Sequence, residues 1–294
     1  MSTPRVSLVR GLLDQAREQF AATGVASPRF DAEELLAHVL GVPRSRLGLC
    51  TDVPPAAQDR FSQLVARRAA REPLQHLTGK APFRHLELDV GPGVFVPRPE
   101  TEVVAGWAID ALQATKRSGP PAATLTAVDL CTGSGAIAAS IAGEVTGVRV
   151  FAVELDDAAH AWAARNLAGT RVTLVHGDAA SAFRELDGTV DVVVANPPYI
   201  PLEAYDGVEQ EVRDHDPALA LWSGDDGLDA IRMVERTARR LLRPGSGLVV
   251  VEHADVQGES APAIFAATGY WSRVRDHTDL ADRPRFVTAQ RIRP

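Results

Sequence analysis

Four acidic or amide side chains stand where apolar segments of the sequence end. Asp129 closes the segment TLTAVDL, Glu154 closes RVFAVEL, Asp178 follows RVTLVH, and Asn196 follows VDVVVA. Carboxylates and amides accept hydrogen bonds from hydroxyl, amino and ammonium groups. This part of the chain is therefore where we expect a polar small molecule to bind.

A glycine loop lies between the first of these segments and a predicted helix. Asp129-Leu-Cys-Thr-Gly133-Ser134-Gly135 follows the apolar segment directly, and glycine lets backbone pass close to a ligand. Nineteen residues after Gly135, Glu154 can accept hydrogen bonds from both hydroxyls of an adenosine ribose. Together the loop and Glu154 predict a nucleoside cofactor.

The spacing of the glycines leaves two nucleoside cofactors open. Gly133-x-Gly135-x-x-Ala138 also satisfies the dinucleotide fingerprint, so a dehydrogenase is one interpretation. Asp129 would repel a pyrophosphate but could help hold the methionine ammonium of S-adenosylmethionine, and Asp178 could accept from the exocyclic amine of adenine. Each Asp alone would more simply be a turn or helix cap. Three acids at three successive strand ends favour S-adenosylmethionine.

Asn196-Pro197-Pro198-Tyr199 is the most specific motif in the chain, and its chemistry suits an amide-type nitrogen. The lone pair of such a nitrogen is delocalised into the carbonyl, which makes it a poor nucleophile. A site for it should present hydrogen-bond acceptors to the NH2 group and favour the positive charge that grows during transfer.

The motif supplies these groups. The Asn196 side-chain oxygen and the Pro197 carbonyl can each accept one N–H, and the Tyr199 ring can stack on the amide plane. Pro197 and Pro198 stiffen the backbone that aims the carbonyl. The simpler alternative is a proline-rich turn that leaves a buried strand. We expect Asn196, Pro197 and Tyr199 to be catalytic, and Pro198 to complete the surface that binds the acceptor.

The intervening residues predict the elements that hold these groups. From Thr124 onward strand-like and helix-like segments alternate, which is typical of a mostly parallel sheet covered by helices on both faces. Ligands of such sheets bind beyond the carboxyl ends of the strands. The final VRDHTDLADRPRFVTAQRI predicts an antiparallel strand pair at the sheet edge. The predicted fold class is α/β with a Rossmann-like sheet.

Two smaller parts are expected before this sheet domain. Apolar residues at helix spacing predict a small helical bundle over residues 1–72. Residues 73–97 change to short alternating segments around Gly91-Pro92-Gly93, which predicts a β-hairpin linker. Residues 98–294 form the main domain, and Arg98-Pro99-Glu100-Thr101-Glu102 begins its first helix with proline and acids at the N-terminus.

Composition and charge narrow the functional classes. No segment reads as a signal peptide or membrane span, and the two cysteines are too few for a disulfide framework or a zinc site, so we expect a cytoplasmic enzyme without a metal. Residues 1–85 hold 12 Lys+Arg against 8 Asp+Glu, whereas the remainder holds 19 against 30. The only dense basic cluster is Arg67, Arg68 and Arg71, which reads most simply as the solvated side of a helix. A mildly basic front suits an acidic protein partner.

On its motifs the sequence resembles the release factor glutamine methyltransferases over nearly its whole length. The motifs are Pro73-Leu-Gln-His76 with Gly79, Val96-Pro-Arg-Pro-Glu-Thr-Glu102, Asp129-Leu-Cys-Thr-Gly-Ser-Gly-Ala136, Asn196-Pro-Pro-Tyr-Ile200, and Asp216-Pro-Ala-Leu219 with Gly224 and Gly227-Leu228. The resemblance implies a class I methyltransferase fold behind an N-terminal helical domain. It also implies methyl transfer from S-adenosylmethionine to the glutamine of the Gly-Gly-Gln tripeptide in peptide chain release factors.

The resemblance carries over to individual positions. It implies a glutamine held by the residues from Asn196 to Tyr199, and a cofactor site made of Asp129, Thr132, Gly133, Ser134, Gly135, Glu154, Asp178, Ala179 and Asn196. Three positions depart from the family pattern: Cys131 stands where glycine is usual, Glu154 where aspartate is usual, and Ala179 where an aromatic residue often covers the adenine.

Two other functions compete with this interpretation. Exocyclic amines of adenine or guanine are also planar and conjugated, so a nucleic-acid methyltransferase would use the same motif. Phosphate contacts would demand a basic surface, whereas residues 86–294 are acidic in balance, so we expect no direct nucleic-acid binding and no membrane binding. A non-enzymatic binding module is disfavoured by an intact acceptor motif beside an intact cofactor loop. We expect the helical front to select the protein partner.

Overall fold

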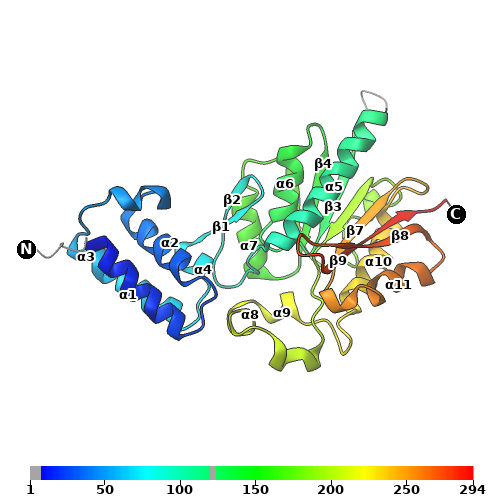
Figure 1. Ribbon diagram of the computed structural model, residues 1–294. Coiled ribbons are helices and arrows are strands. Elements are labelled where there is room, and N and C mark those ends of the chain that lie inside the picture. The colour runs from blue at the N-terminus through cyan, green and yellow to red at the C-terminus, as the bar shows by residue number, and fades with distance from the viewer. Residues whose placement is uncertain (1–7, 120–123, 294) are drawn as a thin grey trace, which may run out of the picture. The chain divides into compact units, whose positions relative to one another are not determined.

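The computed structural model describes residues 8–119 and 124–293, and its contacts divide the chain into two compact units. The larger unit comprises residues 81–208 and 216 onward, and the smaller unit comprises the N-terminal part up to Lys80 together with residues 209–215. Figure 1 shows the elements of both units. The expected division at residues 72 and 97 does not coincide with this boundary, which falls at the first residue of a strand.

The larger unit is built on a seven-stranded sheet in the order β5-β4-β3-β6-β7-β9-β8. Its parallel strands are β3 (Thr126–Leu130), β4 (Arg149–Glu154), β5 (Val172–His176), β6 (Val192–Ala195) and β7 (Leu248–Glu252). The antiparallel pair β8 (Trp271–Thr278) and β9 (Pro284–Arg291) completes one edge. The prediction of a mostly parallel α/β sheet with an antiparallel edge pair is confirmed.

Alternate residues of the central strands bury against helices on opposite faces of the sheet. Ala127 of β3 packs on the face covered by α5 (Pro99–Ser118), α6 (Ala136–Glu144) and α7 (Asp157–Asn166). Val128 and Leu130 pack on the other face, against α10 (Asp229–Leu241) and α11 (Ser260–Ala267). Every residue of β3 is buried, and Asp129 is its only charged residue. A buried acid in such a strand calls for a functional explanation.

Short elements join and extend this framework. They are η2 (Arg184–Leu186), η3 (Leu202–Gly207), α9 (Ala218–Leu221) and η4 (Asp255–Gln257). The helix expected at Arg98 begins at Pro99, where the fixed φ of proline and its missing N–H suit a first helical position. The side chain of Asp156 accepts from two N–H groups at the start of α7 and caps that helix.

A β-hairpin lies within residues 73–97, as expected, but its turn does not fall at Gly91-Pro92-Gly93. The segment begins with a helical turn, α4 (Leu74–Thr78), which ends at Gly79 in the left-handed region. The hairpin pairs β1 (Lys80–Phe83) with β2 (Leu86–Asp89) and turns at Arg84 and His85. Gly91 instead makes room for Trp162, because a Cβ on Gly91 would lie 2.7 Å from the indole ring, and a Cβ on Gly93 would lie 2.8 Å from Ala158.

The smaller unit is helical, as expected, and contains one element from far along the chain. Its helices are α1 (Leu8–Ala22), α2 (Pro28–Leu40), η1 (Arg44–Leu49) and α3 (Pro55–Ala69), packed around Phe20, Leu35, Leu36 and Phe61. The element α8 (Gln210–His215) belongs to this unit by its contacts. No sequence pattern indicated that residues between two motifs of the larger unit would join the N-terminal helices.

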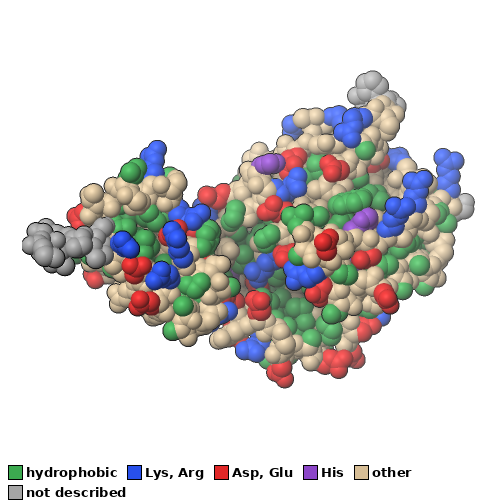
Figure 2. All heavy atoms as spheres, viewed as in Figure 1, with side chains coloured by type: hydrophobic (Ala, Val, Ile, Leu, Met, Phe, Trp, Pro, Cys, Tyr) green, Lys and Arg blue, Asp and Glu red, His purple; other side chains and the backbone are tan. Residues whose placement is uncertain are grey.

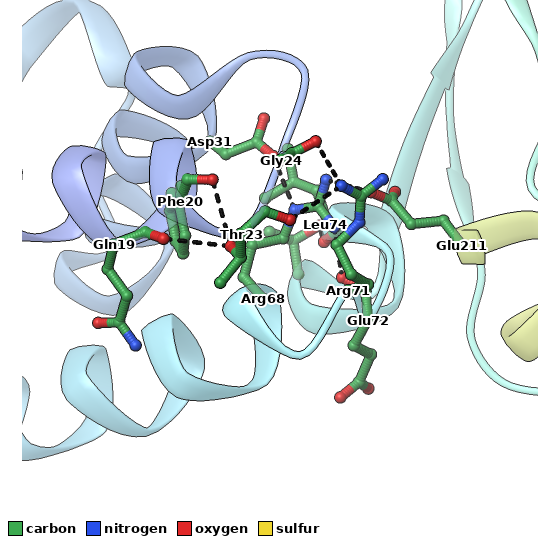
Figure 3. A network of polar contacts seen from close by, with 11 residues as sticks. Gln19, Phe20, Thr23, Gly24, Asp31, Arg68, Arg71, Glu72, Leu74 and Glu211 are labelled. Atoms are coloured by element: carbon green, nitrogen blue, oxygen red, sulfur yellow. Dashed lines mark hydrogen bonds and ion pairs between the residues drawn. The ribbon is translucent and has the colours of Figure 1, made fainter. Parts of the chain in front are cut away.

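A buried ion-pair network holds α8 in the smaller unit, as Figure 3 shows. Arg68 donates to Asp31 at 2.7 Å and to Glu211 at 2.9 Å, and the Arg68 and Asp31 side chains are only 6% and 7% exposed. Arg71 also contacts Glu211 at 2.9 Å. The interpretation of this basic cluster as a solvated helix side is therefore wrong for Arg68, although Arg67 is exposed as expected. Burial raises the pKa of Asp31, and the hydrogen bond from Arg68 opposes that rise.

Two further observations concern the surface. Within the described ranges, no helix is both long enough and apolar enough to cross a membrane. On the face drawn in Figure 2, basic and acidic side chains alternate over the smaller unit. That face presents a mixture of charges to a partner.

Replacing Arg68 should destabilise the smaller unit, because a buried carboxylate would lose its charge partner. Arg68→Met should cost about 3–5 kcal/mol of unfolding free energy, measured by urea denaturation followed by circular dichroism. Without the arginine the pKa of Asp31 rises further above its unfolded value, so the cost should be larger at about pH 8 than at about pH 5.

Arg67→Met is the matched control, since Arg67 is 54% exposed and pairs with Glu72 at the surface. It should cost about 1 kcal/mol or less. Equal losses in the two variants would show that the Arg68 network contributes no more than a surface ion pair.

Candidate functional site

The parallel register brings the predicted site residues to one edge of the sheet. Leu130 of β3 is in register with Val153 of β4 and with Ala195 of β6. The next residues along these strands, Glu154 and Asn196, therefore emerge beside the glycine loop. Asp178 follows β5, which pairs with β4. Asp129 is the penultimate residue of β3 rather than its last.

The glycine loop turns sharply between β3 and α6. Gly133 has φ +58° and Gly135 has φ +84°, both in the left-handed region that glycine enters without steric cost. A Cβ on Gly135 would meet Leu167 at 3.0 Å, whereas a Cβ on Gly133 would meet nothing within 4 Å. Gly133 is therefore required for its conformation, and it leaves open space over the loop.

The cysteine at position 131, where glycine is usual, lies in a strained backbone conformation. Its φ is +60°, a conformation that favours glycine and costs an L-residue roughly 1–2 kcal/mol. The usual glycine at this position would carry no such strain. Burial and the nearby carboxylates raise the pKa of the Cys131 thiol, which favours the neutral form of the thiol.

Asp129 lies beneath the loop and is fully buried. Its Oδ2 accepts from the Thr132 hydroxyl and from the Ala138 N–H at 3.1 Å, so the carboxylate fixes both the loop and the first turn of α6. Its Oδ1 is buried with no hydrogen-bond partner among the described residues. Burial raises the pKa of Asp129 to about 7. A cation bound at this position would favour the ionised carboxylate.

Glu154 differs from the expectation of a carboxylate free to bind ribose. Its Oε2 accepts from the Gly133 N–H at 2.8 Å, and its Oε1 accepts from the N–H groups of Leu155 and Asp156 at 2.8 and 2.9 Å. A carboxylate has about four acceptor sites. One therefore stays available to a hydroxyl while the others hold the loop.

The third acid, Asp178, is exposed and caps a turn through the Ala180 N–H at 2.8 Å. Ala179 beside it is buried in the core of the second sheet face, 6% exposed, together with Phe183. Asp178 thus caps a turn, which is the simpler role that its position in the sequence suggested. A hydrogen bond from the adenine amine to Asp178 stays a prediction.

Contacts from three residues, Gln257, Gly227 and Thr101, hold the acceptor motif that follows β6. Gln257 donates to the Tyr199 carbonyl at 3.0 Å and to the Gly227 carbonyl at 3.3 Å. Gly227 has φ +73°, and a Cβ there would overlap the Tyr199 carbonyl oxygen. The Asn196 amide donates from Nδ2 to the Thr101 hydroxyl at 3.1 Å. The backbone and the amide are both held before any acceptor binds.

Tyr199 is held by the acid that ends β7. Its hydroxyl donates to Oε1 of Glu252 at 3.3 Å, and its ring packs against the core of the second sheet face. Burial raises the pKa of Tyr199 well above its usual range and raises the pKa of Glu252 to about 7. The orientation of the ring is thereby fixed, whereas its stacking on an amide stays a prediction.

The sequence analysis missed Glu252 and Gln257 and gave Thr101 only a helix-start role. Glu252 ends the apolar segment GLVVVE in the same way that Glu154 ends RVFAVE, so the signal for a fourth strand-end acid was present. No sequence signal pointed to Gln257. Two of the motifs meet where Arg98 contacts Asp216 at 2.9 Å.

Comparison with known proteins assigns both parts of the chain. Residues 11–79 match the family described as PrmC N-terminal domain, and residues 127–215 match the family described as Methyltransferase domain. The chain is 57% identical to a release factor glutamine methyltransferase of Streptomyces coelicolor over 98% of this chain and all of that protein.

Two further proteins mark the breadth of the likeness. A 4-amino-L-phenylalanine/4-methylamino-L-phenylalanine methyltransferase of Streptomyces pristinaespiralis is 46% identical over 92% of this chain and 91% of that protein. The hMettl16 catalytic domain, solved in complex with MAT2A 3′UTR hairpin 6, matches with a TM-score of 0.52 and 12% identity over 83% of this chain and 84% of that one. The latter likeness shows the fold alone.

The buried Asp129 predicts that cofactor binding depends on pH. If its carboxylate faces the ammonium of the methyl donor, binding should release a proton below about pH 7, where Asp129 is protonated in the free protein. The affinity for S-adenosylhomocysteine, which keeps this ammonium, should rise with pH up to about 7 and then level off. Calorimetry in buffers of different ionisation enthalpy measures both the affinity and the proton release.

Asp129→Asn keeps an acceptor for Thr132 and Ala138 but should bind more weakly and without this pH dependence. Glu252→Gln removes the other carboxyl that titrates in this range and should leave the dependence in place. An Asp129→Asn variant that binds like the wild type would refute the contact with the ammonium.

Proposed function

This chain belongs to the release factor glutamine methyltransferase family, and we propose that it methylates the side-chain amide nitrogen of the glutamine in the Gly-Gly-Gln motif of peptide chain release factors. Its methyl donor is S-adenosylmethionine, which supplies a methyl group activated by a positively charged sulfur. The observation that carries this proposal is the Asn196–Thr101 hydrogen bond. It leaves the Asn196 oxygen as the end of the amide that can meet a substrate NH2 group.

The residues of the acceptor motif would compensate for the poor nucleophilicity of an amide nitrogen. Oδ1 of Asn196 and the carbonyl of Pro197 would accept the two N–H groups, which fixes the plane of the amide. As positive charge grows on the nitrogen these hydrogen bonds strengthen, so they stabilise the transition state more than the ground state. The clamp by Gln257 and Gly227 keeps both acceptors in place, which limits reorganisation during transfer.

The cofactor residues would bind and orient the donor. Asp129 would hold its ammonium, the glycine loop from Thr132 to Gly135 would pass beneath it, and Glu154 would accept from the ribose. The buried Oδ1 of Asp129 and the space over Gly133 support this assignment.

The competing acceptors are nucleic-acid bases and free aromatic amines. Residues 86–294, which hold the acceptor motif, carry 19 Lys+Arg against 30 Asp+Glu, and this acidic balance argues against a surface built for phosphates. The aromatic-amine relative shows by its name that a sequence of this kind serves another conjugated nitrogen. Incubation with labelled S-adenosylmethionine and, in parallel, release factor, bulk nucleic acid or 4-aminophenylalanine separates the three. Label in the release factor alone is the expected result. We propose that the enzyme acts in the cytoplasm, where translation release factors work.

The smaller unit is proposed to select the protein partner. A Gly-Gly-Gln loop offers little surface, so affinity for a whole release factor must come from contacts elsewhere. On this unit Ser27, Pro28, Arg29, Phe30, Glu33 and Arg44 line a shallow hollow. Phe30 is 44% exposed there, with the Arg44 guanidinium 4.6 Å from its ring centre. Aromatic and arginine side chains are the residue types most often found as anchors of protein interfaces.

Asn196→Ala should raise the barrier to methyl transfer by about 2.7–4 kcal/mol, the effect of removing one preorganised hydrogen-bonding group. The affinity for S-adenosylhomocysteine should change far less. Single-turnover methylation of a Gly-Gly-Gln peptide measures the first quantity and calorimetry the second. Full activity in this variant would show that the motif is only a turn.

Phe30→Ala should lower kcat/KM for the whole release factor roughly tenfold, as expected for an anchor worth about 1.4 kcal/mol. It should leave methylation of a short Gly-Gly-Gln peptide unchanged, and higher salt should slow association of the whole factor. Leu49→Ala, at a 79% exposed position of the same unit outside the hollow, is the control. Equal effects of Phe30→Ala on both substrates would contradict partner selection by this surface.

A further inference from the structure

The element α8 is inserted into the smaller unit from a segment that otherwise belongs to the larger unit. The chain passes from the larger unit into the smaller one between residues 208 and 209, and it returns between residues 215 and 216. A further passage lies between residues 80 and 81. Two of these three passages exist only while α8 stays docked on the N-terminal helices.

Glu211 of α8 supplies a negative charge to the arginine cluster of these helices. Its Oε1 accepts from Arg68 and from Arg71, each at 2.9 Å. The two arginine side chains are only 6% and 18% exposed, and the other carboxylate of the cluster is Asp31, at 2.7 Å from Arg68. Without Glu211, two largely buried guanidinium groups would share one carboxylate, which is unfavourable. Docking of α8 therefore completes the charge balance of the cluster.

The backbone of Arg71 is strained, and its side chain is aimed at Glu211. Its φ is +71°, in the left-handed region that favours glycine, at the position just after the C-cap Ala70 where glycine commonly ends a helix. The guanidinium donates to the carbonyls of Thr23 and Gly24 as well as to Glu211, as Figure 3 shows. Such strain persists where surrounding contacts compensate for it. The contact with Glu211 is one of these compensating contacts.

The loop that carries α8 begins and ends beside the acceptor motif. Ile200, which directly follows Tyr199, donates its N–H to the Leu221 carbonyl at 2.9 Å. The Ser223 N–H donates in turn to the Ile200 carbonyl at 3.0 Å. These bonds close the base of the loop in the larger unit, whereas α8 fastens the same loop in the smaller unit.

We propose that Glu211 is a positioning residue that ties the loop after the acceptor motif to the smaller unit through Arg68 and Arg71. The inference rests on the proposed function, in which the smaller unit selects the release factor and the larger unit methylates its glutamine. Glu211 touches neither the substrate nor the donor in this account.

The physical effect of this tether is on effective concentration. A partner held by one unit meets a site on the other at a concentration that depends on the chain joining the units. With α8 docked, three passages of the chain constrain that encounter. With α8 released, the passage at residues 80 and 81 alone would join the units, so the glutamine of a bound release factor would reach the acceptor motif less often.

Glu211→Gln keeps the size of the side chain and removes its charge. It should lower kcat/KM for the whole release factor roughly tenfold, because the whole factor engages both units. Methylation of a short Gly-Gly-Gln peptide should stay within about twofold of the wild type, since the peptide needs the larger unit alone. Full activity on the peptide also shows that the larger unit is folded. Glu209→Gln, at an exposed position of the same segment, is the matched control and should change neither rate.

Limited digestion with trypsin measures the docking of α8 itself. Arg213 lies within α8, and a protease cuts a segment that opens locally. Cleavage after Arg213, followed by mass spectrometry, should be roughly tenfold faster in Glu211→Gln than in the wild type and unchanged in Glu209→Gln.

A second substitution tests whether Glu211 acts through the arginines. In a Glu211→Gln background, Arg71→Met should have little further effect on the ratio of whole-factor to peptide kcat/KM, whereas independent effects would multiply. Multiplying effects, or cleavage after Arg213 at the wild-type rate, would overturn the inference. So would faster cleavage with an unchanged rate on the whole factor, or equal losses on both substrates. A wild-type protein that methylates neither substrate would instead overturn the proposed function.

Discussion

The parallel register of β4, β3, β6 and β7 determines where chemistry can occur in this protein. Parallel strands end at the same edge of a sheet, so Glu154, the glycine loop, Asn196 and Glu252 emerge at one edge although they span residues 131–252. A donor bound over the loop and an acceptor held after β6, as we propose, would be neighbours for that reason alone. The helices on both faces bury this arrangement and keep its strand ends fixed.

Burial of carboxyl groups at that edge is the main energetic cost of the site. Asp129 and Glu252 lie in an apolar sheet, where an isolated charge is unfavourable, and burial raises the pKa of each to about 7. Each is partly compensated by hydroxyl and N–H donors. The protonation of both acids therefore depends on the charges that lie beside them. The left-handed backbone of Cys131 adds strain at the same edge, as is common where function and stability compete.

The sequence predicted the sheet, and it placed the glycine loop and the Asn-Pro-Pro-Tyr motif directly after strands, because each depends on local signals: alternating segments, glycines after a strand, and prolines that stiffen a turn. Other features arise from contacts between distant segments. The turn of the hairpin lies earlier than the glycines suggested, because Gly91 makes room for the Trp162 ring instead of joining two strands. Arg68 was read as solvated because Glu211 and Asp31 come to it from elsewhere in the chain. Glu252 carried a readable signal, whereas Gln257 carried none.

The central claim is that the site is built for the nitrogen of a side-chain amide. It is tested most directly by locating the transferred methyl group. Whole release factor treated with the protein and S-adenosylmethionine should yield, on tandem mass spectrometry, one peptide with one added methyl on the glutamine of the Gly-Gly-Gln tripeptide. A release factor with glutamate in place of that glutamine should gain no methyl. A methyl group found on a lysine, a carboxyl group or the backbone, with the glutamine unmodified, would contradict the account.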